Sequence, residues 1–158
     1  RLCRDWSSDV CSSDLEKLLY LREGQHSPMH FHRYKMEDII NRGGGTAIIH
    51  VYNATESDEL CTSDVQVNQD GRTYWVKAGT GIELKPGESI TLYQRQYHDF
   101  DVKPGTGNVL LGEVSMCNDD TNDNVFQDAV GRFPKIEEDE PPYRLLCSEY
   151  PKAGGDES

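Results

Sequence analysis

The sequence predicts an all-β protein built as a barrel or sandwich of short strands. Runs rich in β-branched and aromatic residues recur along the chain, as in residues 109–116, and such residues favour strands. Turn signals separate these runs. Residues 64–67 and 73–76 flank the pair Asp70 and Gly71, which is typical of a tight hairpin. Short strands at these intervals indicate a closed or double-layered β architecture.

The remaining elements are predicted in order along the chain. Residues 16–22 fit either a strand or the end of a short helix, because periodicity needs a longer window. Pro28 keeps the residue before it extended and leads into a strand. The glycine triplet at 43–45 predicts a flexible turn. Further strands are expected at residues 46–52, 82–84, 89–93 and 109–116, with a loop at 53–63 and an edge strand at 143–147.

Length and charge restrict the kind of protein. The 158 residues correspond to one domain. The net charge of −12 argues against nucleic-acid and anionic-membrane partners, since phosphates require basic patches. No apolar run approaches the length of a membrane-spanning helix, and no signal peptide is visible. The five cysteines form no CxxC pair, which predicts reduced thiols and a cytoplasmic location.

The first fifteen residues differ in character from the rest. They have no helical or strand period and nearly repeat themselves as SSDVCSSDL. This stretch resembles a translated sequencing adapter, and the alternative is a genuine polar tail. We therefore expect residues 1–15 to be an artefact in place of the natural N-terminus, residues 16–151 to form the domain, and residues 152–158 to be a disordered tail.

The motif that carries chemistry is a pair of histidines followed by a glutamate. His30 and His32 are two residues apart, so on a strand they point to the same face. A bend before Glu37 brings a carboxylate to the same point. Imidazole and carboxylate together suit a first-row divalent metal. The alternative is a surface strand with two solvated histidines.

The glycines around this motif favour the metal. Gly24 lies six residues before the histidine pair, and Gly44 follows the glutamate by seven positions. This spacing is similar to the first motif of the cupin proteins. A later strand must supply a fourth ligand, and His98 fits best because it follows a Pro-Gly turn and a strand-like run. We do not expect His26 or His50 to be ligands.

An acidic, amide-rich stretch follows the last predicted strand of the domain. Residues 118–124 contain three aspartates and three asparagines. The stretch can be a solvated turn, a calcium site or a loop that binds sugar hydroxyls. The spacing of an EF-hand loop is absent.

Taken together, residues 16–151 resemble the D-lyxose isomerase family of cupins. Four stretches carry the resemblance: PMHFHRYKMEDIINRGGG, GTGIELKPGESITLYQRQYHDF, GEVSMCNDDTNDNVF and RFPKIEEDEPPYRLLC. The resemblance implies a double-stranded β-helix barrel of the jelly-roll type, here truncated at its N-terminus, and commonly a homodimer. It also implies an isomerase that uses Mn²⁺, with a small sugar as its partner.

The implied reaction interconverts D-lyxose with D-xylulose, and D-mannose with D-fructose. The resemblance assigns the metal to His30, His32, Glu37 and His98. The reaction moves a proton between C1 and C2 of the open-chain sugar, so it requires a base beside the metal, which acts as a Lewis acid.

Glu113 is our candidate for the base, because it lies within an apolar run and burial disfavours a charged carboxyl group. A structural role for this glutamate is the alternative. Lys35 is expected to stabilise an oxyanion or to donate to O1, unless it is merely exposed. Asp120, Asp123 and Arg132 are candidates for binding sugar hydroxyls.

Two other functions are compatible with the motif. Cupins with similar ligands carry out oxygen chemistry on iron, so an oxygenase is one alternative. A sugar-binding cupin without catalysis is the other. The fold alone does not separate them.

Overall fold

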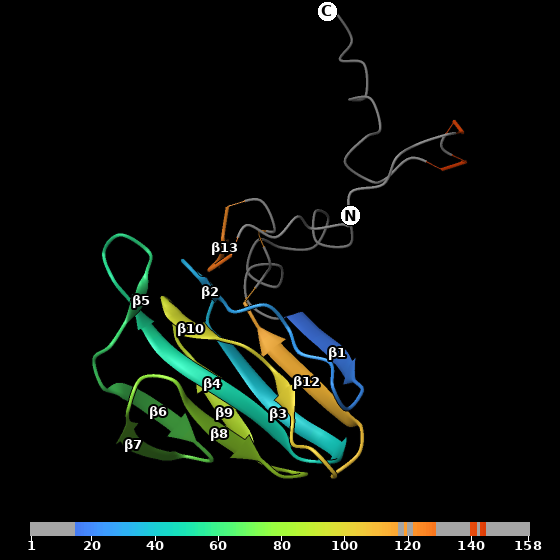
Figure 1. Ribbon diagram of the computed structural model, residues 1–158, viewed down its shortest axis with the longest axis horizontal. Coiled ribbons are helices and arrows are strands. Elements are labelled where there is room, and N and C mark those ends of the chain that lie inside the picture. Colours follow the sequence, from blue (N-terminus) through green and yellow to red (C-terminus); the bar gives the residue numbers. More distant parts are fainter. Residues whose placement is uncertain (1–14, 117–118, 120–121, 129–139, 142, 145–158) are drawn as a thin grey trace, which may run out of the picture.

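Two antiparallel sheets pack face to face in this protein (Figure 1). The computed structural model describes residues 15–116, 119, 122–128, 140–141 and 143–144. The elements formed by these residues are all strands, so the predicted all-β class is confirmed. The described part of the chain contains no helix long and apolar enough to cross a membrane.

The first sheet has six strands, one of which begins at Glu37, the glutamate of the motif. Its order, from one edge to the other, is β1 (Leu15–Leu21), β12 (Val109–Ser115), β3 (Glu37–Gly44), β9 (Ser89–Leu92), β6 (Val65–Gln69) and β7 (Arg72–Val76).

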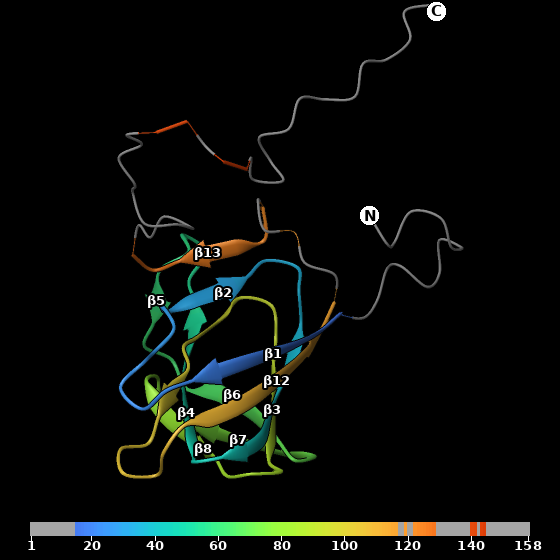
Figure 2. The same ribbon diagram turned by 90° about the vertical axis from the view of Figure 1, so that its right-hand side faces the viewer.

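The second sheet carries the histidines. Its main path is β11 (Asp101–Val102), β4 (Ala47–Ala54), β10 (Gln96–His98), β2 (His30–His32) and β13 (Asn124–Phe126). Two further strands pair with β4, namely β5 (Leu60–Cys61) and β8 (Thr80–Leu84). Figure 2 shows β2 and β13 together at one end of the molecule.

The hydrophobic core lies between the two sheets. Along β4, Ala47, Ile49 and Val51 are fully buried, while the residues between them are only half-buried. This period of two is expected when one face of a strand meets the core. Ile39 of β3 and Leu111 of β12 are buried from the opposite sheet. Each such side chain contributes about 1.5–3 kcal/mol of hydrophobic stabilisation.

The predicted hairpin is confirmed. β6 and β7 pair from Val65↔Val76 to Gln69↔Arg72. The connecting Asp70 and Gly71 both have positive φ angles, of 48° and 73°. A two-residue turn with two positive φ angles matches the right-handed twist of the flanking strands.

The glycine triplet behaves differently from the prediction. β3 continues through Gly43 to Gly44, so the predicted flexible turn is wrong for these two residues. Both pair with β12, and a β-bulge between Leu110 and Leu111 accommodates them. A Cβ on Gly44 would collide with the carbonyl oxygen of Asn108, and the φ angle of Gly44 is +92°. Close backbone approach therefore explains this glycine better than flexibility does.

Several short strands escaped prediction. The predicted loop at 53–63 contains β5, and β10, β11 and β13 have only two or three residues each. The ambiguous segment at 16–22 is strand β1, which pairs along its whole length with β12. The artefact boundary at residue 15 and the tail at 152–158 fall on or beyond the edges of the described residues, as does most of the expected edge strand.

Candidate metal centre and active site

Three histidines meet between the sheets. His30 and His32 lie on β2 with one residue between them, and His98 on β10 pairs directly with His30. One ring nitrogen of each lies within 4.8 Å of the corresponding atoms of the other two. The alternation of side chains along β2 therefore brings both imidazoles to the strand that carries the third.

A carboxylate completes the cluster from the opposite sheet. Glu37 is the first residue of β3 and is 2% exposed. Its Oε1 lies 2.9 Å from Nε2 of His98, and its Oε2 lies 3.4 Å from Nε2 of His32. The four residues that the motif predicted as ligands are thus adjacent in space.

The atoms of this cluster approach one another without forming hydrogen bonds. Among the residues that the structure describes, both ring nitrogens of His32, Nε2 of His98 and Oε1 of Glu37 are buried without a hydrogen-bond partner. Burying such atoms unpaired is costly. A shared cation would satisfy Nε2 of His32, Nε2 of His98 and Oε1 of Glu37, so three imidazoles and a carboxylate fit a first-row divalent metal.

Backbone carbonyls fix the orientation of two of these rings. Nδ1 of His30 lies 2.8 Å from the carbonyl oxygen of Pro28, and Nδ1 of His98 lies 3.0 Å from that of Gln96. A carbonyl only accepts, so each Nδ1 carries the proton and donates it. This tautomer leaves Nε2 with its lone pair, as metal-binding histidines require.

The charge states also suit a metal. Burial, followed by repulsion from His98, lowers the pKa of His30 to about 3, which keeps this ring neutral. Burial raises the pKa of the Glu37 carboxyl group, but its contacts with His32 and His98 outweigh burial and hold that pKa well below its usual range. Neutral imidazoles and an ionised carboxylate are the forms that bind metal ions.

Lys35 connects the cluster to a second carboxylate. Its Nζ lies 2.7 Å from Oε2 of Glu37 and 2.8 Å from Oε1 of Glu113. The side chain is 3% exposed, so the alternative of a solvent-exposed lysine is wrong. Burial lowers the pKa of Lys35, but the two carboxylates outweigh burial and raise it. Lys35 is therefore an ammonium donor at neutral pH.

Glu113 lies in the middle of β12 with its carboxylate held by three donors. Lys35, Lys17 at 3.1 Å and the hydroxyl of Ser115 at 3.0 Å all donate to its Oε1. Sequence analysis missed Lys17 and Ser115. The strand period could have found Ser115, which lies two residues after Glu113 on the same face of β12.

Asp123 is the one acidic-stretch candidate that the structure places at the centre. It is 2% exposed, and its Oδ2 lies 3.7 Å from Nδ1 of His32. Its Oδ1 accepts from the backbone N–H of Tyr34 at 2.7 Å. The structure thus gives this aspartate contacts to the loop after β2. Asp120 and Arg132 lie outside the described residues.

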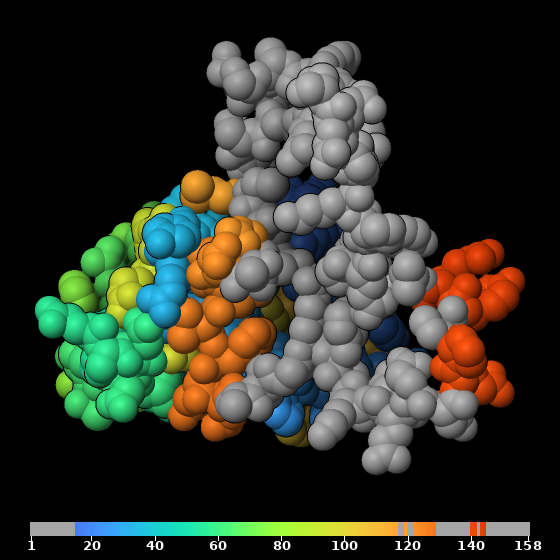
Figure 3. All heavy atoms as spheres, turned by 90° about the horizontal axis from the view of Figure 1, so that it is seen from above, coloured from blue at the N-terminus to red at the C-terminus, as the bar shows by residue number. Residues whose placement is uncertain are grey.

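Aromatic rings cover the histidines on one side. The ring of Phe126 on β13 lies 5.5 Å from that of His30, and Phe100 lies 5.5 Å from that of His98. Figure 3 views this end of the molecule and shows residues 122–128, in orange, beside the blue segment that contains β2.

The two histidines not expected to be ligands lie elsewhere. Nδ1 of His50 lies 2.8 Å from Oδ1 of Asp99, on the side of β4 that faces away from the core. His26 is exposed beside the loop before β2. Among the described residues, the histidines close enough to share a metal ion are His30, His32 and His98.

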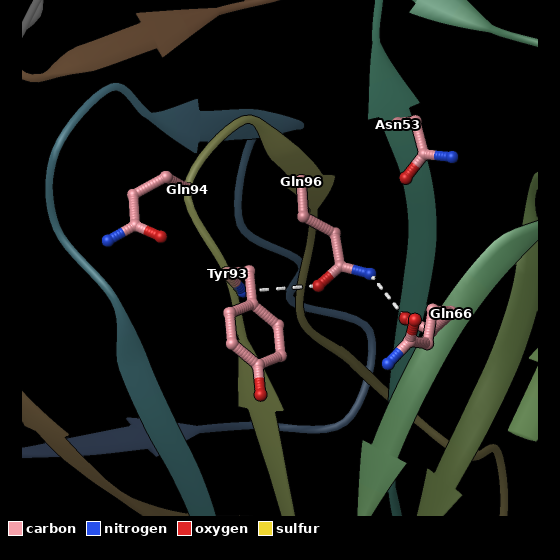
Figure 4. Close-up of a pocket in the computed structure, with 5 residues that line it drawn as sticks. All are labelled: Asn53, Gln66, Tyr93, Gln94 and Gln96. Atoms are coloured by element: carbon pink, nitrogen blue, oxygen red, sulfur yellow. Dashed lines mark hydrogen bonds between the residues drawn. The ribbon is translucent and has the colours of Figure 1, made fainter. Parts of the chain in front are cut away.

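A separate cavity of about 410 Å³ lies at the ends of β4, β6 and β10 (Figure 4). Its lining is uncharged, with the side chains of Asn53, Gln66, Tyr93, Gln94 and Gln96. Gln96 donates to the carbonyl of Gln66 and accepts from the N–H of Tyr93. Both polar atoms of the Gln96 amide are therefore already hydrogen-bonded within the protein. Because the cavity also has no charged side chain in its lining, the metal centre is the better candidate for chemistry.

The fold and the site together define a class of protein. This is a cupin-type β-barrel with a cluster of histidines able to hold a metal ion between its sheets. The family described as D-lyxose isomerase matches residues 8–150. The chain belongs to the D-lyxose isomerase family, which confirms the resemblance found in its motifs.

Two curated relatives are similar over most of this chain. The D-lyxose/D-mannose isomerase of Serratia proteamaculans is 51% identical over 135 residues, which cover 85% of this chain and 59% of the relative. The protein of the same name from Escherichia coli O157:H7 is 47% identical over 85% of this chain and 60% of the relative. The chain thus spans about three-fifths of the length of these relatives.

A solved structure agrees on the fold. The L-ribose isomerase of Cellulomonas parahominis superposes with a TM-score of 0.56 over 73% of this chain and 59% of that protein. The two sequences are 17% identical over this region. The likeness supports the jelly-roll-type cupin barrel that the motifs predicted.

Proposed function

We propose that this chain carries the active site of a metal-dependent aldose–ketose isomerase that interconverts D-lyxose with D-xylulose, and D-mannose with D-fructose. One observation carries the proposal. Lys35 bridges Glu37, a member of the metal cluster, and Glu113, a second buried carboxylate. A metal beside a base is the arrangement that proton transfer between C1 and C2 requires. The names of the two curated relatives contain D-lyxose and D-mannose, which supports these two aldoses as substrates.

The residues that would hold the metal are His30, His32, Glu37 and His98, and we infer that the metal is Mn²⁺. Their unpartnered buried atoms and their mixed nitrogen and oxygen donors fit such an ion. When bound, the ion supplies Lewis-acid stabilisation of negative charge on the sugar oxygens.

Glu113 would move the proton. In the forward direction, its carboxylate would take the proton from C2 of the aldose and return it to C1, while the hydroxyl proton of O2 passes to O1, which yields the ketose. Lys17, Lys35 and Ser115 all donate to the same carboxylate oxygen, Oε1. These donors fix the rotamer of Glu113, so one orientation of the carboxylate serves both carbons. Fixed orientation of a base is a large part of its catalytic effect.

Lys35 would act as a donor rather than as a second base. The two carboxylates raise its pKa, so it keeps its proton at neutral pH. Its contacts with Glu37 and Glu113 support this role, because a positive charge there would stabilise sugar oxygens that become negative during proton transfer. Preorganised charge of this kind stabilises a transition state without reorganisation.

Sugar binding would fall to residues from the acidic stretch and its continuation. We propose that Asp120, Asp123 and Arg132 bind hydroxyl groups. For Asp123, the support is its burial beside His32. Carboxylates accept hydrogen bonds from hydroxyls, and guanidinium groups donate to them.

The expected surroundings of the enzyme are part of the same proposal. Among the described residues, Cys61 is a free cysteine, which suits a reducing cytoplasm. A homodimer remains a prediction, and light scattering coupled to gel filtration measures it directly.

The deciding experiment is an isomerisation assay. The purified chain is stripped with a chelator, reloaded with Mn²⁺, and incubated with D-lyxose while D-xylulose is measured. We expect D-xylulose to form with Mn²⁺ and to be absent after chelation. The same samples need a count of bound metal and a circular dichroism spectrum.

The control is His98→Ala, which removes one ligand from the cluster. We expect this variant to bind less Mn²⁺ and to produce no D-xylulose. A folded wild-type chain that holds Mn²⁺ but leaves both D-lyxose and D-mannose unchanged would contradict the proposed reaction.

A further inference from the structure

A charged cluster lies outside the barrel, behind the strands that carry the histidines. The carboxylate of Asp58, in the turn between β4 and β5, accepts from two guanidinium groups. Arg33 donates to its Oδ2 at 2.6 Å, and Arg95 donates to its Oδ1 at 2.8 Å. Arg33 directly follows β2, and Arg95 directly precedes β10. One side chain therefore connects the ends of two strands that are distant in sequence.

The turn that presents Asp58 is itself tightly constrained. Asp58 has a φ of 66°, in the left-handed region that residues other than glycine rarely adopt. Its backbone N–H donates to the carbonyl of Thr55 at 3.0 Å, and that carbonyl also accepts from Arg95 at 2.6 Å. The hydroxyl of Tyr97 donates to the carbonyl of Asp58 at 2.6 Å. An uncommon backbone conformation that several contacts maintain often marks a functional constraint.

An aromatic ring lies beneath both arginines. Phe31 is fully buried, and the guanidinium carbons of Arg33 and Arg95 lie 5.8 and 5.2 Å from its centroid. Phe31 is the residue between His30 and His32 on β2. Its ring also packs edge-to-face on that of Tyr97, the residue between Gln96 and His98. The outward faces of both ligand-bearing strands thus belong to this cluster.

The strands need such a connection, because their own pairing is minimal. β2 and β10 pair at the single position His98↔His30. Beyond it, the backbone N–H of Arg95 donates to the carbonyl of His32 at 2.8 Å. Arg95 has a φ of 59°, so this contact depends on a second left-handed residue. Because β2 and β10 share so few backbone hydrogen bonds, we expect side-chain contacts outside this pairing to set the spacing of the three histidines.

We propose that Asp58 is a positioning residue for the metal centre, because its bridge between Arg33 and Arg95 fixes the spacing of the strands that carry His30, His32 and His98. The inference rests on the metal site of the proposed function. It adds that a half-exposed carboxylate outside the barrel determines how well the cluster binds a metal. A single exposed ion pair contributes little to holding two strands together. One carboxylate shared by two arginines over a buried aromatic ring forms a network, and such networks contribute more.

Binding of Co²⁺ tests this role without any need for turnover. The chain is titrated with Co²⁺, and its visible absorption reports both affinity and ligand geometry. Asp58→Asn keeps the shape of the side chain and removes its charge. We expect it to weaken Co²⁺ binding about tenfold and to change the absorption spectrum, since residues that orient metal ligands have effects of about that size.

The matched control is Asp64→Asn. Asp64 pairs with Lys77 at 2.8 Å, as Asp58 pairs with its arginines, but this exposed pair lies at the start of β6. We expect its Co²⁺ affinity and spectrum to equal those of the wild type. Arg95→Ala, alone and with Asp58→Asn, completes a double-mutant cycle. The two changes should be less than additive, because they remove the same bridge.

The outcomes separate the two proposals. A wild-type chain that binds no Co²⁺ would contradict both the proposed metal site and this inference. A wild-type chain that binds one Co²⁺, with Asp58→Asn equal to it in affinity and spectrum, overturns the inference alone. Urea unfolding without metal identifies a variant that does not fold. In that case Arg33→Gln, which leaves the bond between Asp58 and Arg95 in place, serves instead, and unchanged affinity in it also overturns the inference.

Discussion

The carboxylate of Glu113 is oriented by hydrogen bonds to one of its oxygen atoms, Oε1. Three donors contact its Oε1, and two of them are ammonium groups. These contacts orient the carboxylate beside Lys35, which also contacts the metal cluster through Glu37. The proposed base is therefore connected to the candidate metal site although it lies on another strand.

We predict that Glu113→Gln removes isomerisation and leaves the metal in place. An amide cannot accept the proton, so kcat should fall about 10²- to 10⁴-fold, the usual contribution of a general base. Mn²⁺ binding, measured by electron paramagnetic resonance, should match the wild type because Glu113 is not one of the four proposed ligands. Glu83→Gln is the control, since Glu83 pairs with Lys103 on the surface. A Glu113→Gln variant with unchanged kcat would exclude this residue as the base.

Asp58 makes a second prediction, for the pH dependence of stability. The hydrogen bonds from Arg33 and then Arg95 hold the pKa of Asp58 below its usual value of 3.8. A carboxyl group with a lowered folded-state pKa stabilises the protein above its unfolded-state pKa. This stabilisation is lost as the pH falls through the lower, folded-state value.

The measurement compares urea unfolding of the wild type and Asp58→Asn over a range of pH. We expect the wild type to be more stable near neutral pH, and the difference to shrink as the pH falls below about 4. A difference that stays constant down to pH 2 would show that the charge of Asp58 does not contribute.

The side chain of Asn41 connects β3 to the end of β8 through hydrogen bonds. It is fully buried on β3, where its side-chain amide donates to the carbonyls of Gly45 and Leu84. Its Oδ1 accepts from the N–H of Gly43. The side chain therefore satisfies backbone groups of the turn after β3 and of the end of β8. This arrangement holds the glycine segment in strand form, which propensity alone did not predict.

We predict that Asn41→Ala destabilises the protein by about 2–4 kcal/mol, because it leaves two buried carbonyls without donors. Urea denaturation of the metal-free chain measures this free energy. Thr62→Ala, at an exposed position outside the strands, should change stability by less than about 0.5 kcal/mol. Equal midpoints for Asn41→Ala and the wild type would contradict the role assigned to this amide.

Metal binding should stabilise the molecule as a whole. The four proposed metal-binding residues lie on β2, β3 and β10, which belong to both sheets, so unfolding separates them. A metal ion that binds only the folded state stabilises it by about 2.7 kcal/mol when its free concentration is one hundred times its dissociation constant. For a chain of this size, we expect the melting temperature to rise by about 5–10 °C.

Calorimetry with Mn²⁺ and with a chelator measures this shift. His98→Ala should lose most of it, because the cluster then has two histidines. A shift of the same size in the variant would place the bound metal elsewhere on the chain.

At the scale of elements, the longer strands and the histidine strand β2 were predictable, whereas most of the other strands of two or three residues were not. The hairpin of β6 and β7 was predictable because its turn, Asp70 and Gly71, is a strong local signal for a tight hairpin. β10 and β13 have three residues each, too few for a periodic pattern. They form strands because β2 lies between them and offers its backbone groups.

The sequence by itself determined the all-β class and proposed His30, His32, Glu37 and His98 as one set, because strand alternation and motif spacing are local properties. Only the tertiary structure brought Lys17 to Glu113, and Asp58 to the arginines beside the ligand strands. These contacts join residues from separate strands and loops. Side chains that are far apart in sequence meet through sheet packing, and local pattern carries little information about that packing.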